Sequence, residues 1–173
     1  MENSMRTTYG ECISELKPNE VMVFGANLSG FHGAGSAGFA SFGVPGNRWR
    51  EFDYANKPKG WKGKWNVKGQ GEGLQEGTEG KSYALPTVWK AGQKRSLSRE
   101  EIVGNIRRMY ACAKAHPQWR FLVAGSTSGR LLCGYSHEEL CAMYRVAGPI
   151  PDNVVFSVSY TDMIEKENRD EVG

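Results

Sequence analysis

The sequence lacks most of the features that identify a function class at sight. Its four cysteines include no Cys-x-x-Cys pair and have no histidine nearby at a metal-ligand spacing, so neither a disulfide framework nor a metal site is predicted. No run approaches the ~18 apolar residues that cross a membrane, and the first residues contain no apolar stretch suited to export. We therefore expect a reduced, cytoplasmic protein that has no membrane partner and no cofactor.

The sequence also lacks a large excess of charge of either sign, because its net charge is only +3 over 173 residues. That balance does not by itself argue for nucleic acid. Between Val44 and Gly69, however, seven basic residues accompany two acidic ones, and Trp61 and Trp65 lie among them. Such a charge run is usually a solvated face; the alternative is a surface for single-stranded nucleic acid, on which both indoles stack against bases.

Glycine, in contrast, is abundant and unevenly placed. Of the 22 glycines, seven lie from Gly25 to Gly46 and seven more from Gly60 to Gly80. Glycine is costly inside helices and strands, so such clusters mark turns or close approach of the backbone to a bound group. The length and the 39% hydrophobic content predict one domain over residues 1–173, with a basic, Trp- and Gly-rich insertion at about 44–80 and an acidic tail from about 162.

Apolar runs and helix-start signals alternate along the chain. Ser98 and Ser136 each begin a capping box that leads into apolar residues at helical spacing, and Pro117 is expected to end the first of these helices. Strands alternating with helices predict an α/β domain with a largely parallel sheet. The predicted strands are Val21–Gly25, Lys81–Leu85 (stopped by Pro86), Arg120–Ala124 and Asn153–Val158.

The most informative segment runs from Val21 to Phe42, where a strand leads through a glycine-rich loop into a helix start. Glycines there expose backbone amides beside the positive end of a helix dipole, an arrangement that suits a phosphate. The alternative is a tight turn that needs small residues. Asn27 is a candidate for holding a ligand hydroxyl or an attacking water, or else forms an Asx-turn. His32 either binds the ligand or caps the turn.

A second glycine-containing loop, from Ala124 to Tyr135, also follows a strand directly. Ligands of open α/β sheets bind outside the carboxyl ends of the strands, so two such loops predict one shared cleft. Tyr135 stacks on a base or ribose, or packs under the capping box at Ser136. Gly69–Gln75 is either a segment that closes over the ligand or a flexible exposed loop, and His137 is expected to be solvated.

Three motifs together resemble a known family. The run VFGANLSGFHGAGSAGFASFG (Val23–Gly43) looks like the opening motif of the small macro-domain-like proteins of tailed bacteriophages. GQGEGLQ with SYALPT, and then FLVAGSTSG–CGYSHEEL, are similar to the family's later motifs and come in the family's order. The resemblance covers roughly Val21 to Phe156. It implies a macro-like, three-layer α/β domain, with a mixed, largely parallel central sheet flanked by helices and a cleft that takes ADP-ribose in true macro domains.

The resemblance also implies a site. Asn27 and the loop that follows it match the part of a macro domain that meets the distal ribose, and the second loop matches the part that embraces the diphosphate. Asn27 and His32 are the predicted catalytic residues. The predicted ligand-binding residues are Gly25, Ala26, Ser29, Gly33, Ala34, Gly35, Ser126, Thr127, Ser128, Gly129, Gly134 and Tyr135.

The predicted partner is a small ADP-ribose-like nucleotide, which the protein binds in the host cytoplasm if a phage encodes it. Two alternatives stay open at this point. In one the protein is a hydrolase of an ADP-ribosyl derivative, for which His32 suits proton transfer because its ordinary pKa lies near neutrality. In the other it is a binding module that sequesters the nucleotide without turnover. Single-stranded nucleic acid is the third-ranked partner.

Overall fold

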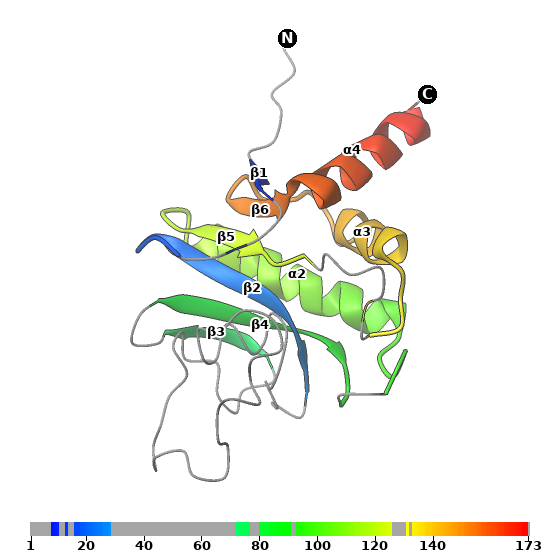
Figure 1. Cartoon of the computed structure of the whole chain (residues 1–173), viewed down its shortest axis with the longest axis horizontal. Coiled ribbons are helices and arrows are strands. Elements are labelled where there is room, and N and C mark those ends of the chain that lie inside the picture. The colour runs from blue at the N-terminus through cyan, green and yellow to red at the C-terminus, as the bar shows by residue number, and fades with distance from the viewer. Residues whose placement is uncertain are drawn as a thin grey trace.

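A computed structural model of the chain describes residues 8–10, 13, 16–28, 72–76, 80–90, 93–125, 131 and 133–172, with side chains to residue 166. Within these ranges six strands and three helices form one α/β unit (Figure 1). In chain order the elements are β1 (Thr8–Tyr9), β2 (Glu20–Asn27), β3 (Gly73–Glu76), β4 (Lys81–Val88), α2 (Arg99–Ala115), β5 (Arg120–Val123), α3 (His137–Val146), β6 (Val154–Ser157) and α4 (Val158–Val172).

The six strands form one sheet in the order β1-β6-β5-β2-β4-β3. All neighbouring pairs are parallel except β3 with β4, which is antiparallel. The predicted α/β class with a mixed, largely parallel sheet is therefore confirmed. β3 and α4 were not predicted as elements: β3 lies in the segment taken as an insertion, and α4 contains the acidic stretch from Asp162.

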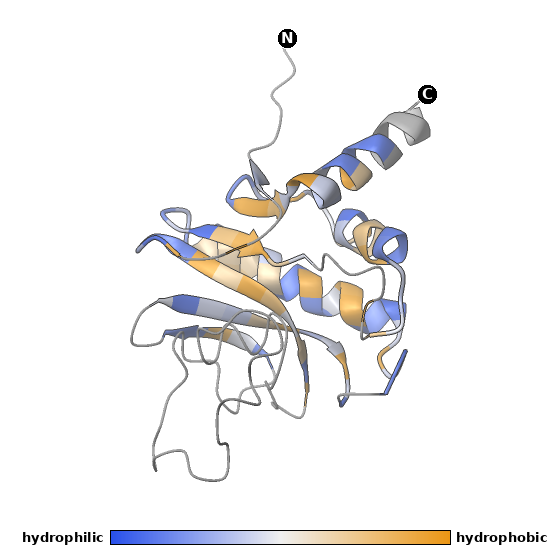
Figure 2. Ribbon diagram, in the orientation of Figure 1, coloured by the Kyte–Doolittle hydropathy of each residue, from blue (hydrophilic) through white to orange (hydrophobic). Residues whose placement is uncertain are grey.

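The central strand β2 is apolar on both of its faces. Val21 and Val23 belong to the main core, whereas Met22, Phe24 and Ala26 belong to a smaller cluster with Ala84. Such a continuous apolar run is typical of a parallel strand that is covered on both sides. Figure 2 shows this run in orange along the middle of β2.

The predicted end of the second strand is wrong, because β4 continues through Pro86 to Val88. The register explains how the sheet accepts a residue that has no N–H. Ala26 pairs with Pro86 and Asn27 pairs with Val88, so the ladder shifts by one residue and Thr87 has no partner of its own in β2. The Pro86 carbonyl is bonded by the side-chain amide of Asn105 in α2 (3.0 Å).

Both predicted capping boxes are confirmed. At the start of α2 the Ser98 hydroxyl accepts from the Glu101 amide (3.1 Å), while the Glu101 carboxylate accepts from the Ser98 amide (2.8 Å). Ser136 and Glu139 make the same reciprocal pair at the start of α3 (3.0 and 2.9 Å). Both crossovers, β4-α2-β5 and β5-α3-β6, move in one direction along the sheet, so right-handed connections put α2 and α3 on the same face.

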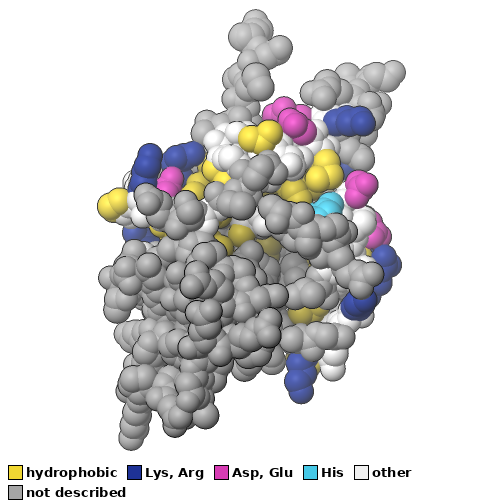
Figure 3. Space-filling view, in the orientation of Figure 1, with side chains coloured by type: hydrophobic (Ala, Val, Ile, Leu, Met, Phe, Trp, Pro, Cys, Tyr) yellow, Lys and Arg dark blue, Asp and Glu magenta, His cyan; other side chains and the backbone are white. Residues whose placement is uncertain are grey.

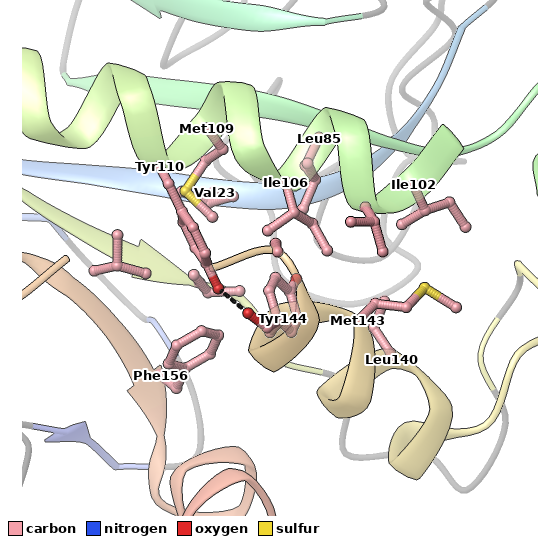
Figure 4. Packing of buried hydrophobic residues seen from close by; sticks show 14 of the residues in the cluster. Val23, Leu85, Ile102, Ile106, Met109, Tyr110, Leu140, Met143, Tyr144 and Phe156 are labelled. Atoms are coloured by element: carbon pink, nitrogen blue, oxygen red, sulfur yellow. Dashed lines mark hydrogen bonds between the residues drawn. The ribbon is translucent and has the colours of Figure 1, made fainter. Parts of the chain in front are cut away.

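The main core lies between that face and the three helices (Figure 4). Ile106 and Met109 of α2 are fully buried over the sheet, and Phe156 of β6 packs edge-on against Tyr144 of α3 with ring centroids 4.9 Å apart. The Tyr110 hydroxyl donates to the Tyr144 carbonyl (2.6 Å), so α2 and α3 are joined by a buried hydrogen bond as well as by packing.

Candidate functional site

The carboxyl end of β5 lies beside the middle of β2, which runs four residues further, to Asn27. Val23 is in register with Val123, and the Ala124 amide continues the ladder by donating to the Val23 carbonyl (2.7 Å). The next described strand after β2 is β3, on the β4 side of the sheet, and the next strand after β5 is β6, on the other side (Figure 1). This divergence makes a topological switch point, where ligands of open α/β sheets bind. We call the ends of β4, β2, β5 and β6 the carboxyl edge.

Three predicted site residues, Gly25, Ala26 and Asn27, form the last part of β2 rather than the start of a loop. Asn27 is 7% exposed and lies at the point where the ladder with β4 shifts register. Gly25 is exposed, and a β-carbon there would meet only Thr87 Oγ1 at 3.7 Å. Space alone therefore does not require glycine at this position.

The first amide of the second loop is bonded within the protein. The Tyr9 hydroxyl accepts a hydrogen bond from the Gly125 amide (3.2 Å) and donates to the Val123 carbonyl. Ser157, at the end of β6, places its hydroxyl 3.4 Å from the position of a β-carbon on Gly125. A ligand on this loop must therefore use amides beyond Gly125.

Gly134 has a structural explanation. Its φ is +88°, and a β-carbon would lie 2.8 Å from Lys94 Cβ and 3.1 Å from the Arg95 backbone nitrogen. Arg95 itself adopts a left-handed φ of 55°. Its amide donates to the Cys133 carbonyl (2.7 Å) and its Nε donates to the Gly134 carbonyl (3.0 Å). Only glycine fits this close approach of two backbone segments.

Tyr135 is held in the same contact. Its side chain is 6% exposed, its hydroxyl donates to the Leu97 carbonyl (2.8 Å), and the Arg95 guanidinium lies 4.7 Å above its ring. Arg95 also reaches the carboxylate of Glu139 (3.1 Å). We call Arg95, Gly134, Tyr135 and Glu139 the Arg95 clamp. These contacts agree with the alternative in which Tyr135 packs inside the protein. Ligand binding by Gly134 and Tyr135 stays a prediction.

The clamp also sets the electrostatics at the start of α3. The backbone N–H of Ser136 and the guanidinium of Arg95 hold the pKa of Glu139 below its usual range. Burial raises the pKa of the Cys133 thiol, which therefore stays protonated and unreactive at neutral pH.

A histidine–tyrosine pair lies at the carboxyl edge and was missed from the sequence. His137 Nδ1 lies 2.7 Å from the Tyr160 hydroxyl, and the two rings meet edge to face with centroids 5.6 Å apart. The Tyr160 ring also lies 4.0 Å from a β-carbon position on Gly125, which places the pair over the start of the second loop. The prediction that His137 is merely solvated is therefore wrong.

The chemistry of this pair follows from burial. Tyr160 is 4% exposed, and burial raises the pKa of its hydroxyl, so the hydroxyl keeps its proton. When this hydroxyl donates to Nδ1, the proton of a neutral imidazole is on Nε2. No sequence pattern links two residues 23 positions apart on different helices.

The segment Gly69–Gln75 is anchored where the structure describes it. Glu72 accepts two hydrogen bonds from Arg108 of α2 (2.8 and 3.1 Å), and Gln75 is buried in β3. The alternative of a flexible, exposed loop is therefore wrong for residues 72–75. Glu72 and Arg108 form a bidentate ion pair, a geometry that fixes the carboxylate in one orientation.

Part of the predicted site lies outside the described residues: Ser29, His32, Gly33, Ala34, Gly35, Ser126, Thr127, Ser128 and Gly129. Within the described residues no group of three histidine, cysteine or carboxylate side chains is placed to hold a metal ion. No helix among those residues has the length and apolarity to span a bilayer. Figure 3 shows the lysine and arginine side chains of the described residues at separate flanks of the viewed face.

Comparison with known proteins adds no family. No protein-family model matches the sequence, and no curated protein matches it. The resemblance to phage macro-domain-like proteins rests on the three motifs alone. The geometry shows that the strand parts of two of those motifs are paired, because Val23 of β2 is in register with Val123 of β5.

Proposed function

We propose that the protein binds an ADP-ribose-type nucleotide at the carboxyl edge, between the ends of β2 and β5. The observation that carries the proposal is the switch point: β2 and β5 are parallel neighbours, and the strands that follow them, β3 and β6, lie on opposite sides of the pair. Asn27 lies on one of these strands and Gly125 follows the other. Both glycine-bearing loops predicted to hold the ribose and the diphosphate begin at these two ends.

The described polar groups suit such a ligand. Asn27 carries a donor and an acceptor of the kind that bind ribose hydroxyls, and His137 carries ring nitrogens of the kind that bind a phosphate oxygen. The Gly125 amide is occupied by Tyr9, so the diphosphate is assigned to amides further along the loop. Because the ligand is held by dipoles and hydrogen bonds, no metal ion enters the proposal.

Calorimetric titration of the full chain with ADP-ribose tests the proposal. We expect a saturable site, and we expect Asn27→Asp to weaken the affinity by about tenfold or more, because a carboxylate replaces the amide donor beside an anionic ligand. Asn19→Asp is the matched control, since Asn19 is exposed at the opposite end of the sheet. Absence of binding at millimolar ADP-ribose, or equal losses in both variants, would overturn the proposal.

A product assay on the same samples separates the two remaining alternatives. An ADP-ribosyl derivative that is bound but recovered intact identifies a sequestering module, whereas release of ADP-ribose identifies a hydrolase. His32→Ala then has a defined expectation in each case. It abolishes turnover in a hydrolase that uses His32 for proton transfer, and it leaves the affinity unchanged in a module that binds without turnover.

A further inference from the structure

Two large apolar side chains are exposed beside Asn27. Trp89, the residue after β4, is 56% exposed, and Leu28, the residue after β2, is 37% exposed. The Leu28 amide donates to the Val88 carbonyl (3.1 Å), so the two strands remain paired up to these residues. The Trp89 amide donates to the Ser96 hydroxyl (2.8 Å), which fixes the backbone that carries the indole.

The register places the indole next to the predicted ribose site. Asn27 pairs with Val88, so Trp89 is the residue immediately beyond the partner of Asn27. Paired strands lie about 4.8 Å apart, a separation that a tryptophan side chain readily spans. The backbone of Trp89 therefore stands beside that of Asn27 and Leu28, at the edge of the sheet where the ligand is proposed to bind.

Exposure alone does not make a site, since single apolar side chains are common on protein surfaces. Val146, for example, is 63% exposed on α3 and needs no ligand to explain it. Trp89 differs in three respects: it is aromatic, it adjoins a second exposed apolar side chain, and it follows β4, the strand paired with the end of β2. Exposed lysines at positions 90 and 94 add positive charge nearby. An exposed indole at the end of the strand paired with β2 suits a planar ring attached to a ribose bound at that end of the sheet.

We propose that Trp89, with Leu28 beside it, stacks against a planar ring carried on the anomeric carbon of the ribose that Asn27 holds. The inference rests on the proposed function and narrows it. It assigns the site to dinucleotides whose second ribose bears an aromatic base, in preference to ADP-ribose with a free anomeric hydroxyl.

The experiment compares two ligands that differ only in that ring. ADP-ribose and NAD⁺ are titrated separately into the wild-type chain and into Trp89→Ala, Trp89→Phe and Val146→Ala. We expect the wild type to bind NAD⁺ about tenfold more tightly than ADP-ribose, because NAD⁺ adds one stacked base. Trp89→Ala removes this preference and leaves the ADP-ribose affinity within about twofold, Trp89→Phe retains part of it, and Val146→Ala changes neither affinity.

The outcomes separate this inference from the proposed function. Binding of neither ligand overturns both. Binding of ADP-ribose without a preference for NAD⁺, or with a preference that Trp89→Ala preserves, overturns the stacking assignment and leaves the nucleotide site standing. Equal weakening of both ligands by Trp89→Ala also overturns it, because the indole would then contact a part that the two ligands share. Circular dichroism of each variant confirms folding. If Trp89→Ala proves unstable, the stacking assignment is tested by the comparison of Trp89→Phe with the wild type.

Discussion

At the amino edge of the sheet, where β2, β4, β5 and β6 begin, polar side chains are bonded to one another and to the backbone. Asn153 donates to the carbonyls of Ala113, His116 and Trp119 (2.8, 3.1 and 2.9 Å), and buried Glu20 accepts from Arg120 (3.2 Å). At the carboxyl edge, Trp89 and Leu28 are exposed and His137 is only half-buried.

The difference separates residues that hold the fold from residues available to a ligand. Groups at the amino edge already use their hydrogen-bonding capacity inside the protein, so their loss is expected to lower stability. The carboxyl edge contains both kinds of residue. The Arg95 clamp is built like the amino edge, whereas the residues after β2 and β4, Leu28 and Trp89, leave apolar side chains at the surface.

The largest expected effect tests whether the Arg95 clamp is structural. Gly134→Ala forces a β-carbon into a left-handed backbone 2.8 Å from Lys94 Cβ, and we expect a loss of about 2–3 kcal/mol in the free energy of unfolding. Urea titration measures it. Gly104→Ala is the control, because a β-carbon there meets nothing within 4 Å and alanine favours the interior of α2. If Gly134→Ala is as stable as the wild type but binds ADP-ribose more weakly, the structural explanation is contradicted and the predicted ligand-binding role of Gly134 is supported.

The next effect concerns the amino edge. Asn153→Ala leaves three carbonyls at the turn between α2 and β5 without their shared donor, and we expect a loss of about 2 kcal/mol. The affinity for ADP-ribose should stay within about twofold of the wild type, since the change lies at the opposite edge. Asp152→Ala, at an exposed neighbouring position, is the control and should change stability little. A large loss of nucleotide affinity in Asn153→Ala would break the distinction between the two edges.

The smallest effect concerns the histidine–tyrosine pair and depends on pH. Burial raises the pKa of Tyr160 above its value of about 10 in the unfolded chain, so the folded state holds this proton more tightly. Its contribution to stability is fully present below pH 10 and is lost as the pH rises further. We expect the wild type to lose about 1 kcal/mol more than Tyr160→Phe between pH 9 and pH 11 in urea titrations. Parallel curves for the two proteins would contradict this assignment.

Local signals predicted the parts of this fold that depend on neighbours in sequence. The capping boxes at Ser98 and Ser136 are such signals, because donor and acceptor lie three residues apart. The passage of β4 through Pro86 was not predictable, since it requires the register shift opposite Ala26 and Asn27. Of the site, the sequence located the two strand ends; it did not reveal that Gly134 is needed for a close contact with Lys94, or that Tyr160 reaches His137.

The two-residue strand β1 has a consequence for how the molecule is made. Thr8 and Tyr9 pair with Phe156 and Ser157. During synthesis, β1 therefore cannot join the sheet until β6 has left the ribosome. Until then Tyr9 cannot bridge Val123 and Gly125, and the loop after β5 starts without its anchor. Contacts this distant along the chain form late because closing so long a loop is entropically costly. The edge at which we propose the nucleotide binds is thus completed only after β6 has emerged, and the core also needs β6, because Phe156 belongs to it.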